Sequence, residues 1–169
     1  MDPSQLKSLI VDVPNFPAPG ILFRDIMPLV RDHFASTVAA LNALVPAAAW
    51  PEIDFVAGIE SRGFILASAL ATQHGKGFVP VRKQGKLPPP VVDYKYSLEY
   101  GAGTLEMQLG RGRVLLVDDV LATGGTLTGA AELCSNAGYQ VEDLLVLLDI
   151  GIAPGYSWRS IRPKSVMVY

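Results

Sequence analysis

One segment constrains the fold of this chain more than any other: VLLVDDVLATGGT, from Val114 to Thr126. Four apolar residues are followed at once by two adjacent carboxylates, Asp118 and Asp119, and then by a turn of small residues. The apolar part is typical of a short strand buried on both faces, and a helical pattern follows over 127–137. The segment therefore predicts a strand–turn–helix unit of an α/β protein.

The same segment predicts a site for a sugar phosphate. Ligands of open parallel sheets bind at the carboxyl ends of the strands, where we expect Asp118 and Asp119. Backbone N–H groups of a glycine turn at a helix start bind anions. We therefore expect the two acids to accept hydrogen bonds from ribose hydroxyls, while a phosphate group binds to the turn, which comprises Ala122, Thr123, Gly124, Gly125 and Thr126.

Two alternatives for this segment are weaker. An ordinary polar strand end before a βα turn does not require adjacent acids directly before ATGGT. A nucleoside-triphosphate P-loop is excluded because no Lys–Ser/Thr pair follows Gly125, and the chain contains no GxGxxG.

The rest of the chain alternates predicted strands and helices. We expect strands over 53–57, 78–81, 113–117, 141–149 and 166–169, helices over 4–10, 32–44 and 62–73, and a hairpin over 91–108. Ser4 and Asp32 are the candidate N-caps of the first two helices. This alternation predicts a parallel sheet with right-handed crossovers, and 169 residues suggest one domain, 1–169.

Composition limits the classes of partner. The net charge of −2 and pI near 5.6 argue against a nucleic-acid binder, which is usually strongly basic. The longest apolar helix-like stretch, 64–71, is far shorter than the roughly 20 residues of a membrane span. The N-terminus lacks the basic start and apolar run of a signal peptide, so we expect a cytoplasmic protein without membrane partners. The single cysteine, Cys134, is expected to be a small apolar residue on a helix.

Ser61 and Arg62 follow the strand predicted over 53–57. Ser61 could simply cap the helix that begins there. Arg62 is unfavourable near a helix N-terminus because of the macrodipole, so its presence suggests another purpose. A guanidinium binds phosphate through two parallel hydrogen bonds, which makes a phosphate ligand the natural candidate.

Four further segments resemble a known family. They are PGILFRDI (19–26), VAGIESRGF (56–64), VPVRKQGKLP (79–88) and YSLEYG (96–101). Together with the segment at 114–126, they resemble the type I phosphoribosyltransferases, and within that family the members that use adenine. The resemblance covers roughly residues 14–150, and the last twenty residues match only loosely.

The resemblance implies a fold and a reaction. The fold would be a central parallel sheet flanked by helices, with a small hood over about 1–30 and a flexible loop and hairpin over about 82–108. The reaction would transfer the phosphoribosyl group of phosphoribosyl pyrophosphate to adenine, giving AMP and pyrophosphate in purine salvage. Magnesium would bind mainly through the substrate, with no metal site of the protein's own, and the chain would form a homodimer.

The resemblance also assigns residues to pyrophosphate. Ser61 and Arg62 belong to a loop that binds pyrophosphate in this family, often with a cis peptide bond. Arg82 and Lys83 begin a basic loop, and Lys86 is the candidate for reaching pyrophosphate when that loop closes. A plain solvated basic loop is the alternative for Arg82 and Lys83.

Base recognition and proton transfer fall on two other segments. Glu99 is the candidate for handling the proton of the base nitrogen, and Tyr100 for shaping the closed site. Phe23 would pack on the purine ring, while the Leu22 backbone and Arg24 would read its edge. Simple core packing is the alternative for Phe23.

Two other function classes remain open at this stage. A phosphoribosyltransferase for another base, such as xanthine, has a similar motif set, and only residues 20–25 argue against it. A non-enzymatic sensor of the donor is the second class. Such repressors usually carry an added DNA-binding domain, for which the short N-terminal segment leaves no room.

Overall fold

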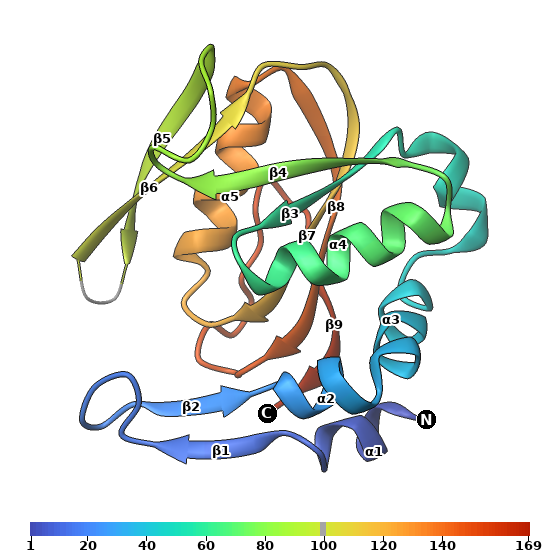
Figure 1. Cartoon of the computed structure of the whole chain (residues 1–169), viewed down its shortest axis with the longest axis vertical. Helices are drawn as coiled ribbons and strands as arrows, with labels where there is room; N and C mark the ends of the chain where they lie inside the picture. Colours follow the sequence, from blue (N-terminus) through green and yellow to red (C-terminus); the bar gives the residue numbers. More distant parts are fainter. Residues whose placement is uncertain (99–100) are drawn as a thin grey trace.

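A seven-stranded sheet lies at the centre of the computed structural model, which describes residues 1–98 and 101–169 (Figure 1). The strand order is β5-β6-β4-β3-β7-β8-β9, and β3, β4, β7, β8 and β9 run parallel. β5 and β6 form an antiparallel hairpin that joins the edge of β4. The strands are β3 (Phe55–Ile59), β4 (Gly77–Lys83), β5 (Val91–Leu98), β6 (Gly101–Gln108), β7 (Gly112–Leu121), β8 (Tyr139–Asp149) and β9 (Lys164–Val168). The predicted parallel α/β sheet is confirmed.

Helices cover both faces of this sheet (Figure 1). They are α1 (Pro3–Lys7), α2 (Met27–Asp32), α3 (Phe34–Asn42), α4 (Arg62–Gln73) and α5 (Gly125–Asn136), with a 3₁₀ helix, η1, at Ala47–Glu52. One core unites α1 to α4 and η1 with the sheet, and a second core lies between the sheet, α5 and the β5–β6 hairpin. None of the helices in the described ranges is both long and apolar enough to cross a membrane.

β7 contributes to both cores, as a strand covered on both faces must. Leu115 and Val117 belong to the first core, whereas Val114 and Leu116 belong to the second. All four are fully buried. The alternation follows from the two-residue period of a strand and explains why the sequence shows an unbroken apolar run here.

β7 is longer than predicted, and the acids lie within it. The sequence suggested a strand that ends at Val117, but the ladder with β8 continues to Leu121, opposite Asp149. The ladder with β3 stops earlier, at the pair Gly58–Val117. Asp118 and Asp119 therefore lie beyond the last ladder pair with β3, and Asp118 is beside the start of α4 at Gly63.

Two helices differ from their predicted positions. The helix expected over 32–44 is observed as α3, Phe34–Asn42, and His33, whose φ of −133° is not helical, separates it from α2, Met27–Asp32, which the sequence did not predict. Asp32 does not cap α3, because its carboxylate binds the guanidinium of the neighbouring Arg31. α1 is capped by Asp2 rather than Ser4, through a reciprocal pair of hydrogen bonds with Gln5.

β1 (Val11–Pro14) and β2 (Leu22–Asp25) form a separate antiparallel pair, which lies below the main sheet in Figure 1. Residues around them are anchored in the first core through Leu6, Ile26 and Leu29, which are fully buried. That residues 1–30 act as a hood, and that the chain is one domain, remain predictions.

Candidate active site

The carboxyl end of β7 and the start of α4 meet in one ion pair. The Arg62 Nη2 atom lies 2.6 Å from Asp119 Oδ2, and both side chains are mostly buried. This Oδ2 atom is buried and has no hydrogen bond, so the contact with Arg62 is electrostatic rather than directional. Two motifs that are nearly sixty residues apart in the sequence are therefore in direct contact.

Asp118 is held more rigidly than its neighbour. Its Oδ1 atom accepts a hydrogen bond of 2.9 Å from the backbone N–H of Asp119. A Cβ atom at Gly63 would lie 3.0 Å from the same Oδ1, so only glycine allows α4 to approach this closely. Burial, and then the negative charge of Asp119, raise the pKa of Asp118 well above its ordinary value.

The turn that joins β7 to α5 has the predicted geometry. Gly124 has a φ of +86°, the left-handed region that favours glycine, and stands at the N-cap of α5. Its carbonyl accepts the first helical hydrogen bond, from Thr128 N at 2.8 Å. A small cavity of about 70 Å³ lies against this turn, lined by Asp118, Val120, Leu121, Ala122, Thr123, Gly124, Thr126 and Leu127.

Tyr156 supports the turn from the C-terminal segment. A Cβ atom on Gly124 would lie 2.4 Å from the Tyr156 ring, so the ring packs directly on the glycine backbone. The Tyr156 hydroxyl also shares a hydrogen bond of 2.8 Å with the Thr128 hydroxyl. Sequence reasoning missed Tyr156, because it lies more than thirty residues beyond the turn in a segment without a recognisable pattern.

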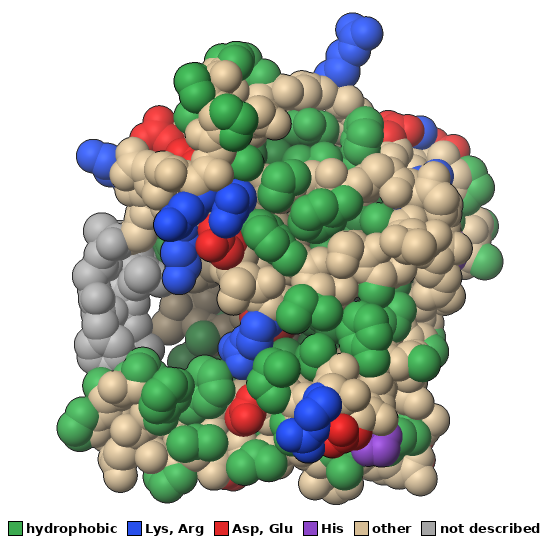
Figure 2. All heavy atoms as spheres, in the orientation of Figure 1, with side chains coloured by type: hydrophobic (Ala, Val, Ile, Leu, Met, Phe, Trp, Pro, Cys, Tyr) green, Lys and Arg blue, Asp and Glu red, His purple; other side chains and the backbone are tan. Residues whose placement is uncertain are grey.

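A wide cavity of about 790 Å³ lies between β1–β2 and the start of α4. Figure 2 shows a hollow on this face, with Lys and Arg side chains gathered around it. The lining residues are Val13, Phe16, Phe23, Asp25, Met27, Ser61, Arg62 and Lys83. The structure thus brings Phe23 together with three of the residues expected at the pyrophosphate end.

Phe23 forms an aromatic and cationic cluster at this cavity. Its ring packs edge-on against Phe16 at 5.1 Å, and the Arg62 guanidinium lies 5.0 Å from its centroid. Arg24, the next residue on β2, faces elsewhere: its side chain pairs with Asp12 and stacks at 4.0 Å over Tyr169. Only the backbone of Arg24 is therefore left to contact a ligand in the cavity.

The loop between β3 and α4 contains Glu60, Ser61 and Arg62. The Glu60–Ser61 peptide bond is cis, and the Glu60 carboxylate accepts hydrogen bonds from Lys83 N at 3.0 Å and Arg82 Nε at 3.3 Å. The bond from Lys83 N, together with Arg82, lowers the pKa of Glu60. Ser61 occupies the N-cap position of α4, but its side chain makes no capping bond.

Arg82 and Lys83, which were expected to begin the basic loop, are the last two residues of β4 and pair with β6, so the loop itself starts at Gln84. Lys83 is exposed and lines the wide cavity, whereas Lys86 is exposed and does not contribute to its wall. Arg82 is turned inward, because its guanidinium binds Glu60 and donates to the carbonyl of Lys86 at 3.0 Å. Arg82 therefore connects this loop to the loop at Ser61 rather than facing the cavity.

Glu106 on β6 was not identified from the sequence. It is only 3% exposed, and its carboxylate accepts hydrogen bonds from the backbone N–H groups of Gly85, Lys86 and Leu87. Glu106 lies between two core residues in a strand that otherwise shows no acidic pattern. The signal that could have indicated it is the pairing of an acid with a base: Glu106 lies opposite Arg82 where β6 pairs with β4.

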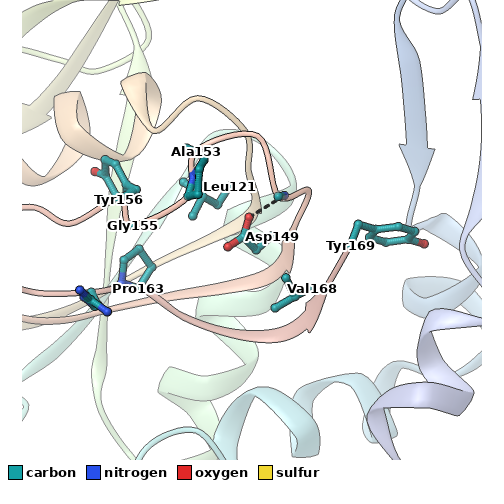
Figure 3. Close-up of a pocket in the computed structure, with 11 residues that line it drawn as sticks. Leu121, Asp149, Ala153, Gly155, Tyr156, Pro163, Val168 and Tyr169 are labelled. Atoms are coloured by element: carbon teal, nitrogen blue, oxygen red, sulfur yellow. Dashed lines mark hydrogen bonds between the residues drawn. The ribbon is translucent and has the colours of Figure 1, made fainter.

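A third cavity, of about 370 Å³, lies at the ends of β7, β8 and β9 (Figure 3). It borders the turn through Leu121 and Tyr156, but none of the predicted site residues lines it. Its acid, Asp149, accepts a hydrogen bond of 2.8 Å from Gly151 N. The predicted site residues line the other two cavities and a further one of about 370 Å³, which lies between the β5 strand and the turn at Thr123, Gly124 and Gly125.

Two predicted residues, Glu99 and Tyr100, lie outside the described residues. Within the described ranges, 1–98 and 101–169, no three His, Cys, Asp or Glu side chains come together as a metal-binding group. Cys134 is buried in the second core, as predicted, and burial raises the pKa of its thiol to about 12.

Comparisons with known proteins agree with this geometry. Residues 33–153 match the family model described as "Phosphoribosyl transferase domain". An adenine phosphoribosyltransferase of Hydrogenovibrio crunogenus is 47% identical over 97% of this chain and 96% of its own. The chain belongs to the adenine phosphoribosyltransferase family.

Solved structures show the same relationship. The adenine phosphoribosyltransferase of Thermoanaerobacter pseudethanolicus superposes with a TM-score of 0.90 at 35% identity, with 99% of each chain covered. The Giardia lamblia enzyme, crystallised with 9-deazaadenine, gives 0.88 at 36% identity, over 100% of this chain and 98% of its own. The fold is that of the type I phosphoribosyltransferases.

Proposed function

We propose that this chain transfers the phosphoribosyl group of phosphoribosyl pyrophosphate to adenine, giving AMP and pyrophosphate in purine salvage. The observation that carries the proposal is the contact between Arg62 and Asp119, because it joins the turn at the start of α5 to the cavity beside Phe23. A donor with a phosphate at one end and a pyrophosphate at the other fits this arrangement. The 9-deazaadenine bound to the Giardia relative supports adenine as the base.

The ribose 5-phosphate end of the donor is assigned to the turn. The backbone N–H groups at the N-terminus of α5 have no partners within the helix and carry its positive dipole end. Residues Ala122 to Thr126 would surround the phosphate, and all of them except Gly125 line the small cavity. Asp118 and Asp119 would accept hydrogen bonds from the ribose hydroxyls, since both lie near the carboxyl end of β7, beyond its ladder with β3.

The pyrophosphate end is assigned to the opposite side. Arg62, Lys83 and the Ser61 backbone line the wide cavity, and Lys86 lies on the adjoining loop. Positive groups fixed there stabilise the charge that develops as pyrophosphate leaves. Arg62 is paired with Asp119 in the structure, so we expect it to exchange this carboxylate for a phosphate oxygen when the donor binds.

Adenine is assigned to the Phe23 side of the cavity. The exposed face of the Phe23 ring offers a flat apolar surface, and Phe16 supports the ring edge-on. Leu22 and Arg24 are two residues apart on β2, so their backbone N–H and C=O groups face the same edge of that strand. This edge could read the edge of the purine by backbone hydrogen bonds, with no need for the Arg24 side chain.

The chemical step passes through an oxocarbenium-like state at the anomeric carbon. Asp118 and Asp119 would orient the ribose, and Glu99 would exchange the proton of the base nitrogen, an effect typically worth about 10²–10⁴-fold. Closure of the loop and hairpin over 82–108, with Tyr100 helping to shape the closed site, would exclude water from the reacting carbon.

Magnesium is the proposed metal. Mg²⁺ is usually bound by one or two carboxylates together with substrate phosphates, and the pair Asp118 and Asp119 fits that pattern. The buried Asp119 Oδ2 makes no hydrogen bond, and it would become available to the metal once Arg62, 2.6 Å away, exchanges it for a phosphate oxygen. Bound there with the donor, the metal would neutralise charge on the leaving pyrophosphate.

A homodimer is proposed from the surface of α4 and β4. Ile65 and Phe78 are large apolar side chains that are 38% and 37% exposed, and Phe78 packs edge-on against Phe64. Light scattering on the purified protein tests this assembly. The cytoplasmic location stays a prediction, which cell fractionation tests.

The decisive experiment supplies the donor and magnesium with adenine, hypoxanthine, guanine or xanthine in turn and measures pyrophosphate release. We expect release with adenine alone and AMP as the second product. Release with another base instead would overturn the base assignment at Phe23. No release with any base, while the donor still binds, would favour a sensor over an enzyme.

A further inference from the structure

Glu106 makes three hydrogen bonds that no step of the proposed reaction requires. Its Oε1 atom accepts from Lys86 N and Leu87 N, each at 2.6 Å, and its Oε2 atom accepts from Gly85 N at 2.9 Å. Three successive backbone N–H groups pointing at one carboxylate form an anion-binding nest. Here the anion belongs to the protein itself, so the nest fixes the shape of the loop.

The loop has few packing contacts at its turn. Gly85 has a φ of +81°, and a Cβ there would meet no atom within 4 Å, so hydrogen bonds rather than side-chain packing hold this turn. Residues 83–86 are all exposed, and only the next residue, Leu87, is half-buried. Bonds from three N–H groups to a buried carboxylate are charge-assisted and therefore stronger than ordinary backbone bonds.

A second connection relates the loop to the cavity. Arg82 pairs with Glu106 in the register of β4 and β6, donates to the Lys86 carbonyl, and binds Glu60 on its other side. Glu60 precedes Ser61 and also accepts from Lys83 N. The chain of contacts from Glu106 thus reaches the loop that contains Ser61 and Arg62.

We propose that Glu106 is a positioning residue for the pyrophosphate half of the donor site. By fixing the turn at 85–87, it presents Lys83 beside Ser61 and Arg62 and keeps Lys86 within reach of the same anion. Preorganised cations bind tightly because little conformational entropy is lost on binding. This role rests on the proposed function only in taking pyrophosphate as the ligand of the wide cavity.

The test uses Glu106→Gln, which keeps the size of the side chain. The amide oxygen can still accept two N–H groups, but the amide nitrogen is a donor and cannot accept the third. Glu142→Gln is the matched control, because Glu142 lies on β8 and bonds only to Gln140 among the contacts of its side chain in the described residues. Melting curves of both variants establish that they are folded.

The expected result separates the two substrates. Glu106→Gln should raise KM for phosphoribosyl pyrophosphate by about tenfold, the loss that follows from a charge-assisted bond. KM for adenine should stay within about twofold of the parent value, because a change of that size corresponds to a very small difference in binding free energy. Calorimetric titration with pyrophosphate alone should show the same tenfold loss. Glu106→Asp, which keeps the charge, should recover part of the affinity.

Two results would overturn the inference. One is a folded Glu106→Gln variant with unchanged affinity for pyrophosphate. The other is an equal rise of KM for donor and base, which indicates general destabilisation instead of positioning. Failure of the proposed function can be told apart from failure of this inference. In the first case the parent protein would form no AMP, while titration with pyrophosphate would still compare Glu106→Gln with Glu142→Gln.

Discussion

The turn at the start of α5 and the loop between β4 and β5 are proposed to bind the two ends of the same donor, yet they are held in opposite ways. The turn is fixed by neighbours in the sequence: Gly124 by its own φ and by Thr128 N, Asp118 by Asp119 N. The loop is fixed by Glu60 and Glu106, which lie about twenty residues away. The backbone hydrogen bonds of the turn are local, although the Tyr156 ring also packs on Gly124, whereas the loop depends on distant carboxylates.

This difference indicates how each region should respond to change. A site built from local backbone geometry is already formed before the ligand arrives, and it tolerates no side chain where glycine is required. A site held by a few remote hydrogen bonds can rearrange when those bonds are altered. Substitutions in the two regions should therefore differ in their effects on donor binding and on stability.

Glu99→Ala should slow the chemical step without weakening binding at either of the two phosphate-binding regions. We expect turnover to fall by about 10²-fold or more, the usual contribution of a general acid or base, while donor affinity changes little. Steady-state AMP formation and donor titration measure the two quantities, with Glu142→Ala as the control. Unchanged turnover would remove Glu99 from the mechanism.

Gly124→Ala should damage the turn severely. The left-handed backbone costs a non-glycine residue about 1–2 kcal/mol, and the new methyl group would clash with the Tyr156 ring. We expect KM for the donor to rise by about ten- to a hundredfold, because 1.4 kcal/mol corresponds to tenfold. Gly75→Ala is the control for backbone strain alone, since Gly75 also has a positive φ but open space around it. Equal effects of the two substitutions on donor KM would contradict the assignment.

Asp118→Asn should stabilise the protein while it weakens donor binding about tenfold, the loss of roughly one charge-assisted hydrogen bond. The raised pKa of Asp118 means that the folded state holds this proton more tightly than the unfolded chain does. The free energy of unfolding therefore falls as pH rises from the ordinary value of 3.8 through the raised pKa, and this loss persists at higher pH.

The neutral amide removes that penalty and can still accept the bond from Asp119 N. At neutral pH we expect the melting temperature of Asp118→Asn to rise by about 2–4 °C, which is roughly 1 kcal/mol for a chain of this size. Melting curves from pH 4 to 8 measure the difference. A variant that is less stable than the parent across this whole range would show that Asp118 is not destabilised by burial.

Tyr156→Phe should have the smallest effect. The ring that packs on Gly124 remains, and only the hydroxyl bond to Thr128 is lost, at a cost of about 0.5–1.5 kcal/mol. Thermal unfolding should show a decrease of a few degrees, and KM for the donor should rise less than for Gly124→Ala. A larger rise than that of Gly124→Ala would mean that the hydroxyl, rather than the glycine, shapes the turn.

The contrast also explains what the sequence could predict. The order of strands and helices, the range of α4 and the turn at Gly124 follow from apolar periodicity and local turn chemistry, which act over a few residues. The hydrogen bonds from the basic loop to Glu106 depend on the pairing between β4 and β6, and no local sequence pattern predicts them. The Asp12 and Tyr169 contacts of Arg24 likewise depend on tertiary packing.

Strand and helix ends were predicted less well for the same reason. β7 extends to Leu121 because β8 continues beside it, although its own apolar run stops at Val117. Asp32 has the residue type of an N-cap, but Arg31 binds its carboxylate and α3 begins at Phe34 instead. A neighbouring strand decides where β7 ends, whereas the adjacent side chain of Arg31 occupies the carboxylate that could have capped the helix.

The most direct test of the central claim is a pair of calorimetric titrations, with ribose 5-phosphate and with pyrophosphate, on the variants Gly124→Ala and Lys83→Ala. If the two regions bind opposite ends of one donor, Gly124→Ala loses ribose 5-phosphate and keeps pyrophosphate, whereas Lys83→Ala shows the reverse. If both variants weaken both ligands to the same extent, the division of the donor between the turn and the loop is wrong.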